Sequence, residues 1–457
     1  MATRSDRVVS VFSGCGGLDL GFEEAGFIIS RAFDWDSAAV EVYNRNLSPV
    51  AAQFDVQSEE FHAVVESIGS ADVVLGGFPC QGFSKAGPKQ ASDGRNLLYL
   101  EMKRVVEVLT PALFIAENVD GMSQNFGGRF VREIISDFAA IGYEVEHRIL
   151  DCVAFGVPQH RRRVFFVGVR SGIGNGFPWP RPTHRASHRN GEFRVERRVG
   201  YGFVEDLPQL SILDSTGDHD APLPPLTVRD AIADLGPLGS VPDHDIVRNW
   251  PRTYDSIMSA VKAGQKLCNV RHAPTSVYTW QIPEAFGATT NRERRILDTI
   301  ARNRRHKRYG NIPNGNPLLP SVIEALSGLC GIDRDIASLV AKGYLKPIGD
   351  GYDLKGAMFC SGLFKRPLWD EPSPTVLTNF FNPRYFLHPS EDRPFSLREC
   401  ARLQGFPDSF IFTEPGCTTL QDGYRLVGNA VPPPVGRAFG ESGARFLQAL
   451  SETSAAT

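Results

Sequence analysis

Over its first 170 residues the chain alternates short apolar runs with amphipathic stretches. The runs are VVSVF (8–12), FIISRAF (27–33), ADVVLGG (71–77), ALFIAENV (112–119), EVEHRIL (144–150) and RVFFVGV (163–169). Between them, stretches such as LLYLEMKRVVEVL (97–109) place apolar residues at helical spacing. This alternation predicts an α/β fold with a doubly wound sheet, which binds its ligands at the carboxyl ends of the strands.

The pattern changes near residue 172. Residues 177–198 are rich in proline, arginine and histidine, a composition that interrupts helices and strands. Periodic apolar positions return over 291–345, and a helical pattern over 435–450 lies near the end of the chain. We therefore place a domain boundary near residue 172.

The composition is that of a globular protein with room for two domains. The chain has 457 residues, of which 42% are hydrophobic and 22% charged, and this balance argues against disorder. Its formal net charge is −3, so the total charge does not indicate a polyanionic partner. Any surface for nucleic acid must then be a local basic patch.

The eight cysteines are scattered and include no C-x-x-C pair, so we expect neither a disulfide framework nor a metal site. The N-terminus leads directly into a strand-like run without a secretory apolar segment. No apolar stretch approaches the roughly 18–20 residues that span a bilayer. These features predict a cytoplasmic protein with reduced thiols and no membrane contact.

A glycine-rich loop follows the first predicted strand. Its residues are Ser13, Gly14, Cys15, Gly16 and Gly17, and a helical pattern comes next. Such a loop either closes a tight turn or lets the backbone approach a ligand. Asp34 ends the second strand and Trp35 follows it. An acid there suits ribose hydroxyls and an indole suits an adenine face, which favours a nucleoside cofactor.

The third run leads into a proline- and glycine-bounded loop that contains Cys80. A cysteine at the carboxyl end of a strand lies where α/β folds place their chemistry. The alternative is a buried, inert thiol, which is common for free cysteines.

Two further strands carry charged residues at or next to their ends. Glu117-Asn118 closes the fourth run, and Gln159-His160-Arg161-Arg162-Arg163 leads into the last. Taken singly, Glu117 suits the start of a helix and the arginines suit a solvated face. A thiol, a carboxyl group and arginines on successive strand ends, beside a ligand loop, form a coherent catalytic set.

Six ordered motifs resemble those of the DNA cytosine-5 methyltransferases, in particular the bacterial modification enzymes. In this chain they are Phe12–Gly17, Phe78–Gln81, Glu117–Val119, Gln159–Arg163, Arg398–Pro407 and Gly428–Val431. The resemblance covers residues 8–170 and about 372–447, and the segment between falls where this family carries its variable target-recognition region. It implies a catalytic domain of residues 1–171 and 420–457 and a target-recognition domain of residues 172–419.

The resemblance also implies a reaction. Cys80 would attack carbon 6 of a flipped-out cytosine, so that carbon 5 becomes nucleophilic enough to accept a methyl group. Glu117 would face N3 of the base, Arg163 and Arg161 would hold the base and the reacting loop, and Asn118 would support that loop.

The donor implied by the resemblance is S-adenosylmethionine, which leaves as S-adenosylhomocysteine, with no metal. The residues implied to bind it are Phe12, Ser13, Gly14, Cys15, Gly16, Gly17, Asp34, Trp35, Asp55, Pro79, Leu98, Asn429, Ala430 and Val431. Among them, Asp55 would lie near the adenine amino group, and Asn429 at the interface with the recognition region.

The substrate implied is double-stranded DNA. The stretch 82–94 resembles the loop that closes over a flipped nucleotide, and its neighbourhood would contact DNA through Gln81, Ser84, Lys85 and Arg95. We expect a monomer that works beside a cognate restriction endonuclease or another defence component. The alternatives are a transfer-RNA cytosine-5 methyltransferase and a catalytically silent DNA-binding homologue.

Residues 291–358 predict a winged-helix-like module within the recognition domain. Three short helical patterns precede a two-stranded pattern that turns at Gly349-Asp350-Gly351. Residues 291–308 hold eight Arg or Lys against two acids, and we expect Arg302, Arg304 and Arg305 to contact DNA phosphates. The alternative is an insertion with a solvated basic helix.

Overall fold

The computed structural model describes residues 6–79, 98–124, 128–174, 176–185, 223–269, 272–312, 315–355 and 362–456. The chain folds into two compact units. The first comprises Met1–Asp245, Asp370–Thr378 and Leu397–Thr457, and the second Ile246–Trp369 and Asn379–Ser396. Each is described by itself.

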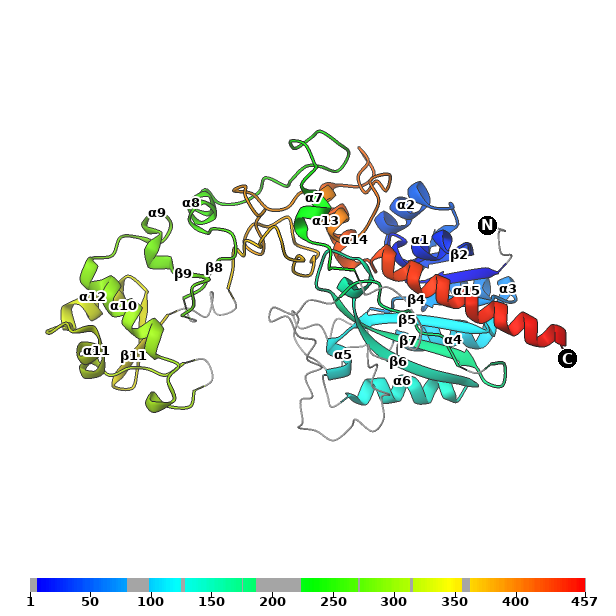
Figure 1. Ribbon diagram of the computed structural model, residues 1–457, viewed down its shortest axis with the longest axis horizontal. Helices are drawn as coiled ribbons and strands as arrows, with labels where there is room; N and C mark the ends of the chain where they lie inside the picture. Colours follow the sequence, from blue (N-terminus) through cyan, green and yellow to red (C-terminus); the bar gives the residue numbers. More distant parts are fainter. Residues whose placement is uncertain are drawn as a thin grey trace. The chain divides into compact units, whose positions relative to one another are not determined.

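The first unit is built on a seven-stranded sheet of order β3-β2-β1-β4-β5-β7-β6 (Figure 1). Its strands are β1 (Arg7–Val11), β2 (Ile28–Asp34), β3 (Ala51–Gln53), β4 (Val73–Gly76), β5 (Leu113–Val119), β6 (Tyr143–Asp151) and β7 (Arg162–Arg170). The first five are parallel, whereas β7 runs antiparallel to both β5 and β6. The strand order reverses between β1 and β4, so the two loops that follow these strands flank the switch point, where such sheets bind ligands. The predicted α/β fold is confirmed.

Helices cover both faces of this sheet. The helices of this unit are α1 (Gly17–Glu24), α2 (Ser37–Asn46), α3 (Glu59–Ile68), α4 (Tyr99–Leu109), α5 (Gly121–Gln124), α6 (Arg129–Ala139), α7 (Val228–Ile232), α13 (Leu397–Leu403), α14 (Leu420–Asn429) and α15 (Pro433–Ala456), with the 3-10 helix η4 (Cys152–Phe155). Of these, α13 contacts both α7 and α14, and the three lie beyond one end of the sheet (Figure 1). Successive side chains of β7 point to opposite faces of the sheet, because side chains alternate along a strand. Phe166 joins the core beneath α3, α4 and α6, while Phe165 packs against Phe439 of α15, with 4.6 Å between the ring centroids.

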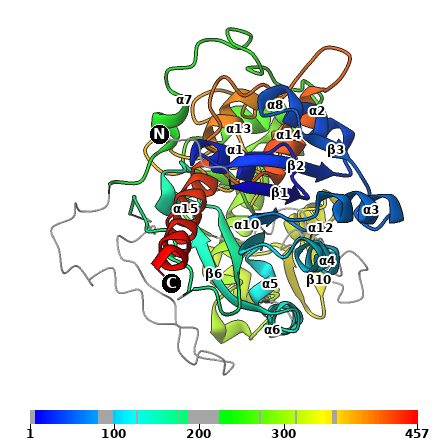
Figure 2. The same ribbon diagram turned by 90° about the vertical axis from the view of Figure 1, so that its right-hand side faces the viewer.

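Helices α1 and α15 lie against each other in both views (Figures 1 and 2), and glycines make this contact close. A Cβ added to Gly21 would lie 2.2 Å from the backbone nitrogen of Arg437, and one added to Gly436 would lie 2.7 Å from the carbonyl oxygen of Leu18. Only glycine permits such an approach of two backbones. This packing ties the end of the chain to the glycine-rich loop before α1.

The compact units divide the chain elsewhere than at residues 172 and 420. The first unit extends to Asp245 and also includes 397–419. Buried ion pairing explains this extension: the Arg398 guanidinium donates to the Asp243 carboxylate at 3.1 Å, and Asp243 also accepts from the backbone nitrogens of Phe412 and Thr413. The assignment of catalysis and target recognition to separate domains stays a prediction.

The second unit contains two small apolar clusters. Its elements are α8 (Thr253–Ala260), β8 (Lys266–Leu267), β9 (Ser276–Val277), η5 (Thr279–Gln281), α9 (Pro283–Phe286), α10 (Asn291–Asn303), η6 (Lys307–Tyr309), α11 (Pro320–Ser327), α12 (Asp333–Ala341), β10 (Leu345–Ile348) and β11 (Gly351–Leu354). The predicted three helices and antiparallel hairpin, with Ile348 paired to Gly351, are confirmed as α10 to β11. Ile296, Ile300 and Leu339 pack around the buried Trp280.

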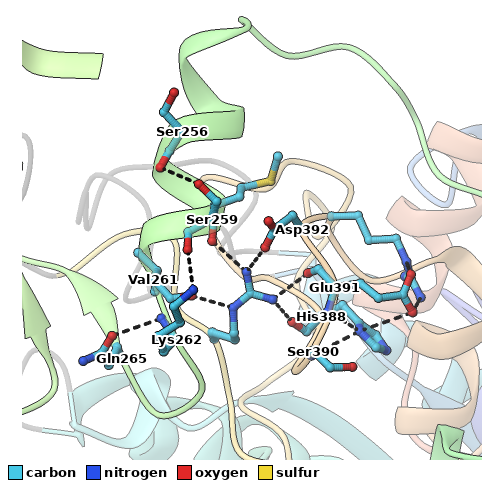
Figure 3. A network of polar contacts seen from close by, with 12 residues as sticks. Ser256, Ser259, Val261, Lys262, Gln265, His388, Ser390, Glu391 and Asp392 are labelled. Carbon is cyan, nitrogen blue, oxygen red and sulfur yellow. Dashed lines mark hydrogen bonds and ion pairs between the residues drawn. The ribbon is translucent and has the colours of Figure 1, made fainter. Parts of the chain in front are cut away.

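A buried arginine holds together the part of this unit around α8. Arg366 donates to the carbonyl oxygens of Val261 (2.7 Å), Met258 (2.8 Å) and His388 (2.6 Å) and to the carboxylate of Asp392 (2.7 Å), in the network that Figure 3 shows. These partners come from two separate stretches of chain, and Arg366 lies on a third. One guanidinium therefore cross-links a region that has little regular secondary structure.

Candidate active site

The carboxyl end of β5 carries a buried ion pair. Antiparallel pairing sets Val119 opposite Arg163, and the Arg163 Nε lies 2.8 Å from the Glu117 Oε1. Burial raises the pKa of Glu117, and the positive charges of Arg163 and Arg161 partly offset that rise. A carboxyl group whose pKa is raised holds a proton at higher pH than usual, so it can donate that proton to a ring nitrogen.

Asn118 connects this strand end to the loop that contains Cys80. Its Nδ2 donates to the carbonyl oxygen of Phe78 at 2.9 Å, and its Oδ1 accepts from the backbone nitrogen of Val119 at 2.8 Å. The amide therefore fixes the chain two residues before Cys80. Four other predicted site residues lie outside the described residues together with Cys80, namely Gln81, Ser84, Lys85 and Arg95.

Gly77, just after β4, faces both the glycine-rich loop and Glu117. A Cβ added there would lie 3.8 Å from the Glu117 Oε2 and 3.8 Å from the carbonyl oxygen of Phe12. The structure thus brings together three segments that the sequence predicts to share one site.

Asp34 shapes the glycine-rich loop. One carboxylate oxygen accepts from the backbone nitrogen of Gly14 at 2.8 Å, and the other accepts from that of Asp36 at 3.0 Å. Burial is the main cause that raises the pKa of Asp34. Asp34 therefore supports the backbone of the loop and is also a candidate ribose ligand. The sequence did not indicate the first of these roles.

Several features around Asp34 fit a nucleoside cofactor. The Trp35 side chain is 78% exposed, so one face of its indole is open to stacking. Phe12 has a φ of 54° and Gly14 one of 56°, both in the left-handed region. A non-glycine residue held there stores backbone strain, which clusters at ligand sites. Ser13 anchors the loop to β2 because its backbone nitrogen donates to the carbonyl oxygen of Phe33 at 3.1 Å.

Close packing requires the two adjacent glycines of the loop. A Cβ on Gly16 would lie 2.5 Å from the Leu47 side chain, and one on Gly17 would lie 2.2 Å from the carbonyl oxygen of Val431. The structural and the ligand-binding interpretations of this loop are therefore compatible. Cys15 is buried, and burial raises the pKa of its thiol to about 12, so only its backbone is suited to a ligand.

The fully buried Arg161 has a structural role that the sequence did not indicate. Its guanidinium donates to the carbonyl oxygens of Val376 (3.2 Å), Gly428 (3.1 Å) and Ala430 (2.9 Å). These three contacts tie the start of β7 to the G-N-A-V segment. The role of Arg161 in holding the base and the reacting loop stays a prediction.

The same junction contains two buried glutamines whose role the sequence motifs did not reveal. The Gln159 side chain accepts from the backbone nitrogen of Val376 at 2.8 Å and donates to the carbonyl oxygen of Leu403 and to Gln404. Gln404 in turn donates to the carbonyl oxygen of Ala430. Their position beside motif arginines was the one sign in the sequence of a role for these glutamines. The role itself was not predictable, because their hydrogen-bond partners lie far along the chain.

The remaining predicted cofactor residues lie near the same edge of the sheet. Leu98 precedes α4 and packs partly buried against the core, as Phe12 does. Asp55 is exposed before α3, and its carboxylate accepts from the backbone nitrogen of Gln57 at 3.0 Å. Asn429 is exposed at the end of α14.

Arg302 and Arg305 of the recognition module are exposed, but Arg304 is not. Its guanidinium pairs with the buried Asp353 carboxylate through contacts of 2.6 and 2.7 Å. The expectation that Arg304 contacts DNA is therefore corrected, because its donors are turned into the protein.

Within the described part of the chain, no group of three or more His, Cys, Asp or Glu side chains is arranged to hold a metal ion. No described helix is both long and apolar enough to cross a membrane.

Comparisons with known proteins identify the family of this chain. The family model for C-5 cytosine-specific DNA methylases matches residues 7–216 and 283–444. The chain is 30% identical to the Type II methyltransferase M.AgeI of Thalassovita gelatinovora, over 95% of this chain and 98% of the relative. It is 29% identical to M.HgiBI of Herpetosiphon aurantiacus, over 95% and 96%.

A solved structure described as a DNA modification methyltransferase encoded within an E. coli prophage matches the fold. Its TM-score is 0.52 at 21% identity, over 97% of this chain and all of that chain. The family match spans most of the sequence and includes the strand ends that carry Gly14, Glu117 and Arg163. The chain belongs to the C-5 cytosine-specific DNA methylase family and is a DNA cytosine methyltransferase.

Proposed function

We propose that this enzyme methylates a cytosine flipped out of a specific duplex sequence, through a covalent bond between Cys80 and carbon 6 of the base. The observation that carries the proposal is the buried Glu117–Arg163 pair, which lies beside the Asn118 amide that holds the start of the Cys80 loop. A carboxyl group, a guanidinium and a thiol then converge on one planar ring.

Carbon 5 of cytosine is too poor a nucleophile to accept a methyl group directly. The Cys80 thiolate adds to carbon 6, and the electron pair of the 5,6 double bond moves to carbon 5. After methylation, a base removes the proton from carbon 5, the double bond re-forms and Cys80 departs as a thiolate. Cysteine suits both addition and departure because its thiolate is accessible near neutral pH.

Glu117 acts on the opposite edge of the ring in this proposal. A protonated carboxyl group donates to N3 and thereby offsets the negative charge that develops when the thiolate adds. Arg163 keeps Glu117 oriented through the 2.8 Å contact, and its remaining donors are suited to the carbonyl oxygen of the base.

S-adenosylmethionine supplies the methyl group when it is bound. The exposed Trp35, the buried Asp34 carboxylate and the strained turn at Phe12 fit its nucleoside part. The carboxylate retains lone pairs beyond those used by the Gly14 and Asp36 nitrogens, and these are suited to ribose hydroxyls.

Flipping makes carbons 5 and 6 accessible, since stacking hides them within a duplex. It costs a few kcal/mol, which contacts to the extruded base and its phosphates offset. In this proposal Gln81, Ser84, Lys85 and Arg95 provide such contacts. In this proposal the enzyme is a monomer. Its relatives are designated Type II methyltransferases, which supports a cognate restriction endonuclease or another defence component as its partner.

A Cys80→Ser variant tests the covalent step. The serine hydroxyl is far less ionised, so methyl transfer from labelled donor to duplex DNA should be lost while DNA and donor binding remain. Wild-type protein should form a covalent adduct with duplex that carries 5-fluorocytosine, whose fluorine blocks the final elimination. Normal turnover by the variant, or transfer RNA methylated in preference to DNA, would refute the proposal.

A further inference from the structure

The module from α10 to β11 has the order of elements of a winged-helix fold, in which the third helix usually enters the major groove. Its surface charges do not follow that plan. We propose that this module binds duplex DNA phosphates through the end of α10 and η6, by Arg302, Lys307 and Arg308, and not through α12 and the hairpin. The inference rests on the proposed function because it concerns the same DNA substrate.

Positive charge accumulates at the end of α10. Residues 302–308 read RNRRHKR, and no acid occurs in the sequence between Asp298 and Glu324. Arg302, Arg305, Lys307 and Arg308 are exposed. Arg308 lies over the ring of Tyr309, 4.6 Å from its centroid, which leaves its charge at the surface. Asp298 lies one turn before Arg302 on α10, and its carboxylate accepts from the Trp280 indole at 2.9 Å. Closely spaced cations with few neighbouring acids are typical of a phosphate-binding surface.

The fold buries one arginine of this run, so only the other cations are available to contact DNA. Arg304 is 3% exposed and pairs with Asp353 of β11. That pair anchors the end of α10 to the hairpin, and so fixes the backbone that carries the surrounding cations. Preorganised charges lose less conformational entropy when they bind a ligand.

Helix α12 offers a different surface. Its first turn carries Asp333 and Asp335, and Asp335 pairs with Arg292 at 3.1 Å. The Lys342 ammonium that follows α12 is held by both carboxylate oxygens of Glu293, at 2.8 and 2.9 Å. The remaining cation of α12 is Arg334, which is exposed next to the exposed Asp333.

The groove between α12 and the hairpin is also unlike a phosphate site. It is lined by Asp333, Ile336, Ala337, Val340, Pro347 and Tyr352. Apolar side chains with an acid at one end provide neither the positive charge nor the donors that a DNA backbone requires. The charge distribution therefore favours the end of α10.

The experiment compares two sets of charge removals, of three and two charges, in the full-length protein without methyl donor. One variant carries Arg302→Ala, Lys307→Ala and Arg308→Ala, and the control carries Arg334→Ala and Lys346→Ala on α12 and β10. Fluorescence anisotropy of a labelled duplex measures the dissociation constant at several salt concentrations. Each lost phosphate contact reduces the slope of log affinity against log salt by about 0.9, so the triple variant should lose up to about 2.7.

The control should keep the wild-type slope. A charge-conserving variant, Arg302→Lys with Lys307→Arg and Arg308→Lys, should also keep most of it, which separates charge from packing. An unchanged slope in the triple alanine variant would overturn the inference, as would an equal loss in the control. Tighter binding of single strands than of duplex would overturn it as well. Wild-type protein that binds duplex but transfers no methyl group would refute the proposed function and leave this inference intact.

Discussion

The guanidinium of Arg163 lies against the carboxylate of Glu117, with 2.8 Å between Nε and Oε1. Both side chains are largely buried, at 14% and 11% exposure, so little water screens the pair. Burial raises the pKa of Glu117 and the arginine lowers it again, which tunes the pH at which the carboxyl group loses its proton.

A pH profile tests this relationship. If protonated Glu117 assists the reaction, the methyl-transfer rate should fall as pH rises through its pKa. Arg163→Gln removes a cation that lowers this pKa, so the falling limb should move to higher pH. Glu117→Gln should lose that limb and slow transfer by roughly 10²- to 10⁴-fold. Single-turnover rates at saturating DNA and donor provide the measurement. A falling limb that stays in place in Arg163→Gln would contradict the coupling.

Asp34 should matter for donor binding in two ways. Its carboxylate would bind the ribose hydroxyls, and it accepts a hydrogen bond from the backbone nitrogen of Gly14 that shapes the loop. Loss of a hydrogen bond to a charged group is worth roughly 1.5–3 kcal/mol, so Asp34→Ala should weaken donor binding by about 10- to 150-fold. DNA affinity should change little. Calorimetric titration checks this, with Glu66→Ala on α3 as a control at an exposed carboxylate that has no predicted role in the site. Wild-type donor affinity in Asp34→Ala would remove the residue from the cofactor site.

The close contact of α1 with α15 predicts a steric penalty. In Gly21→Ala the new methyl group would lie 2.2 Å from the Arg437 nitrogen, so the helices must separate. Overpacking of this kind typically costs about 1–3 kcal/mol. Gly443→Ala is the matched control on α15, because its methyl group would meet Leu113 at an ordinary 3.4 Å. Urea unfolding should show a lower midpoint only for Gly21→Ala. Equal midpoints would mean that the helices tolerate more space than the structure indicates.

The stability of the recognition module should depend on the buried Arg304–Asp353 pair. Arg304→Met leaves the Asp353 carboxylate buried without its cation, which should cost about 3–5 kcal/mol. Arg304→Met with Asp353→Leu should recover most of that loss, because neither charge then remains. Arg302→Ala, at an exposed position, should change stability by less than about 0.5 kcal/mol. Thermal unfolding of the four proteins gives the comparison. An Arg304→Met variant as stable as wild type would show that the pair is dispensable.

Local patterns predicted much of the fold and the catalytic edge. Six of the seven strands follow apolar runs, whereas β3 was missed because Ala51–Gln53 is too short to form a pattern. Parallel strands bring their carboxyl ends to one edge, so residues just after separate runs were expected to meet. The proximity of Phe12, Gly77 and Glu117 agrees with that expectation.

The sequence by itself determined which elements form and which reactive side chains follow them, because hydrophobic periodicity and turn residues act over a few positions. Only the tertiary structure decided which of two nearby arginines is buried in a structural contact. Arg304 is buried two residues from the exposed Arg302 because helical rotation turns it toward Asp353, 49 residues away. Arg161 is buried two residues from Arg163 because its acceptors include the carbonyl oxygen of Gly428, 267 residues away. The partners that neutralise or hold these cations are distant in the chain, and no local pattern of charge contains them.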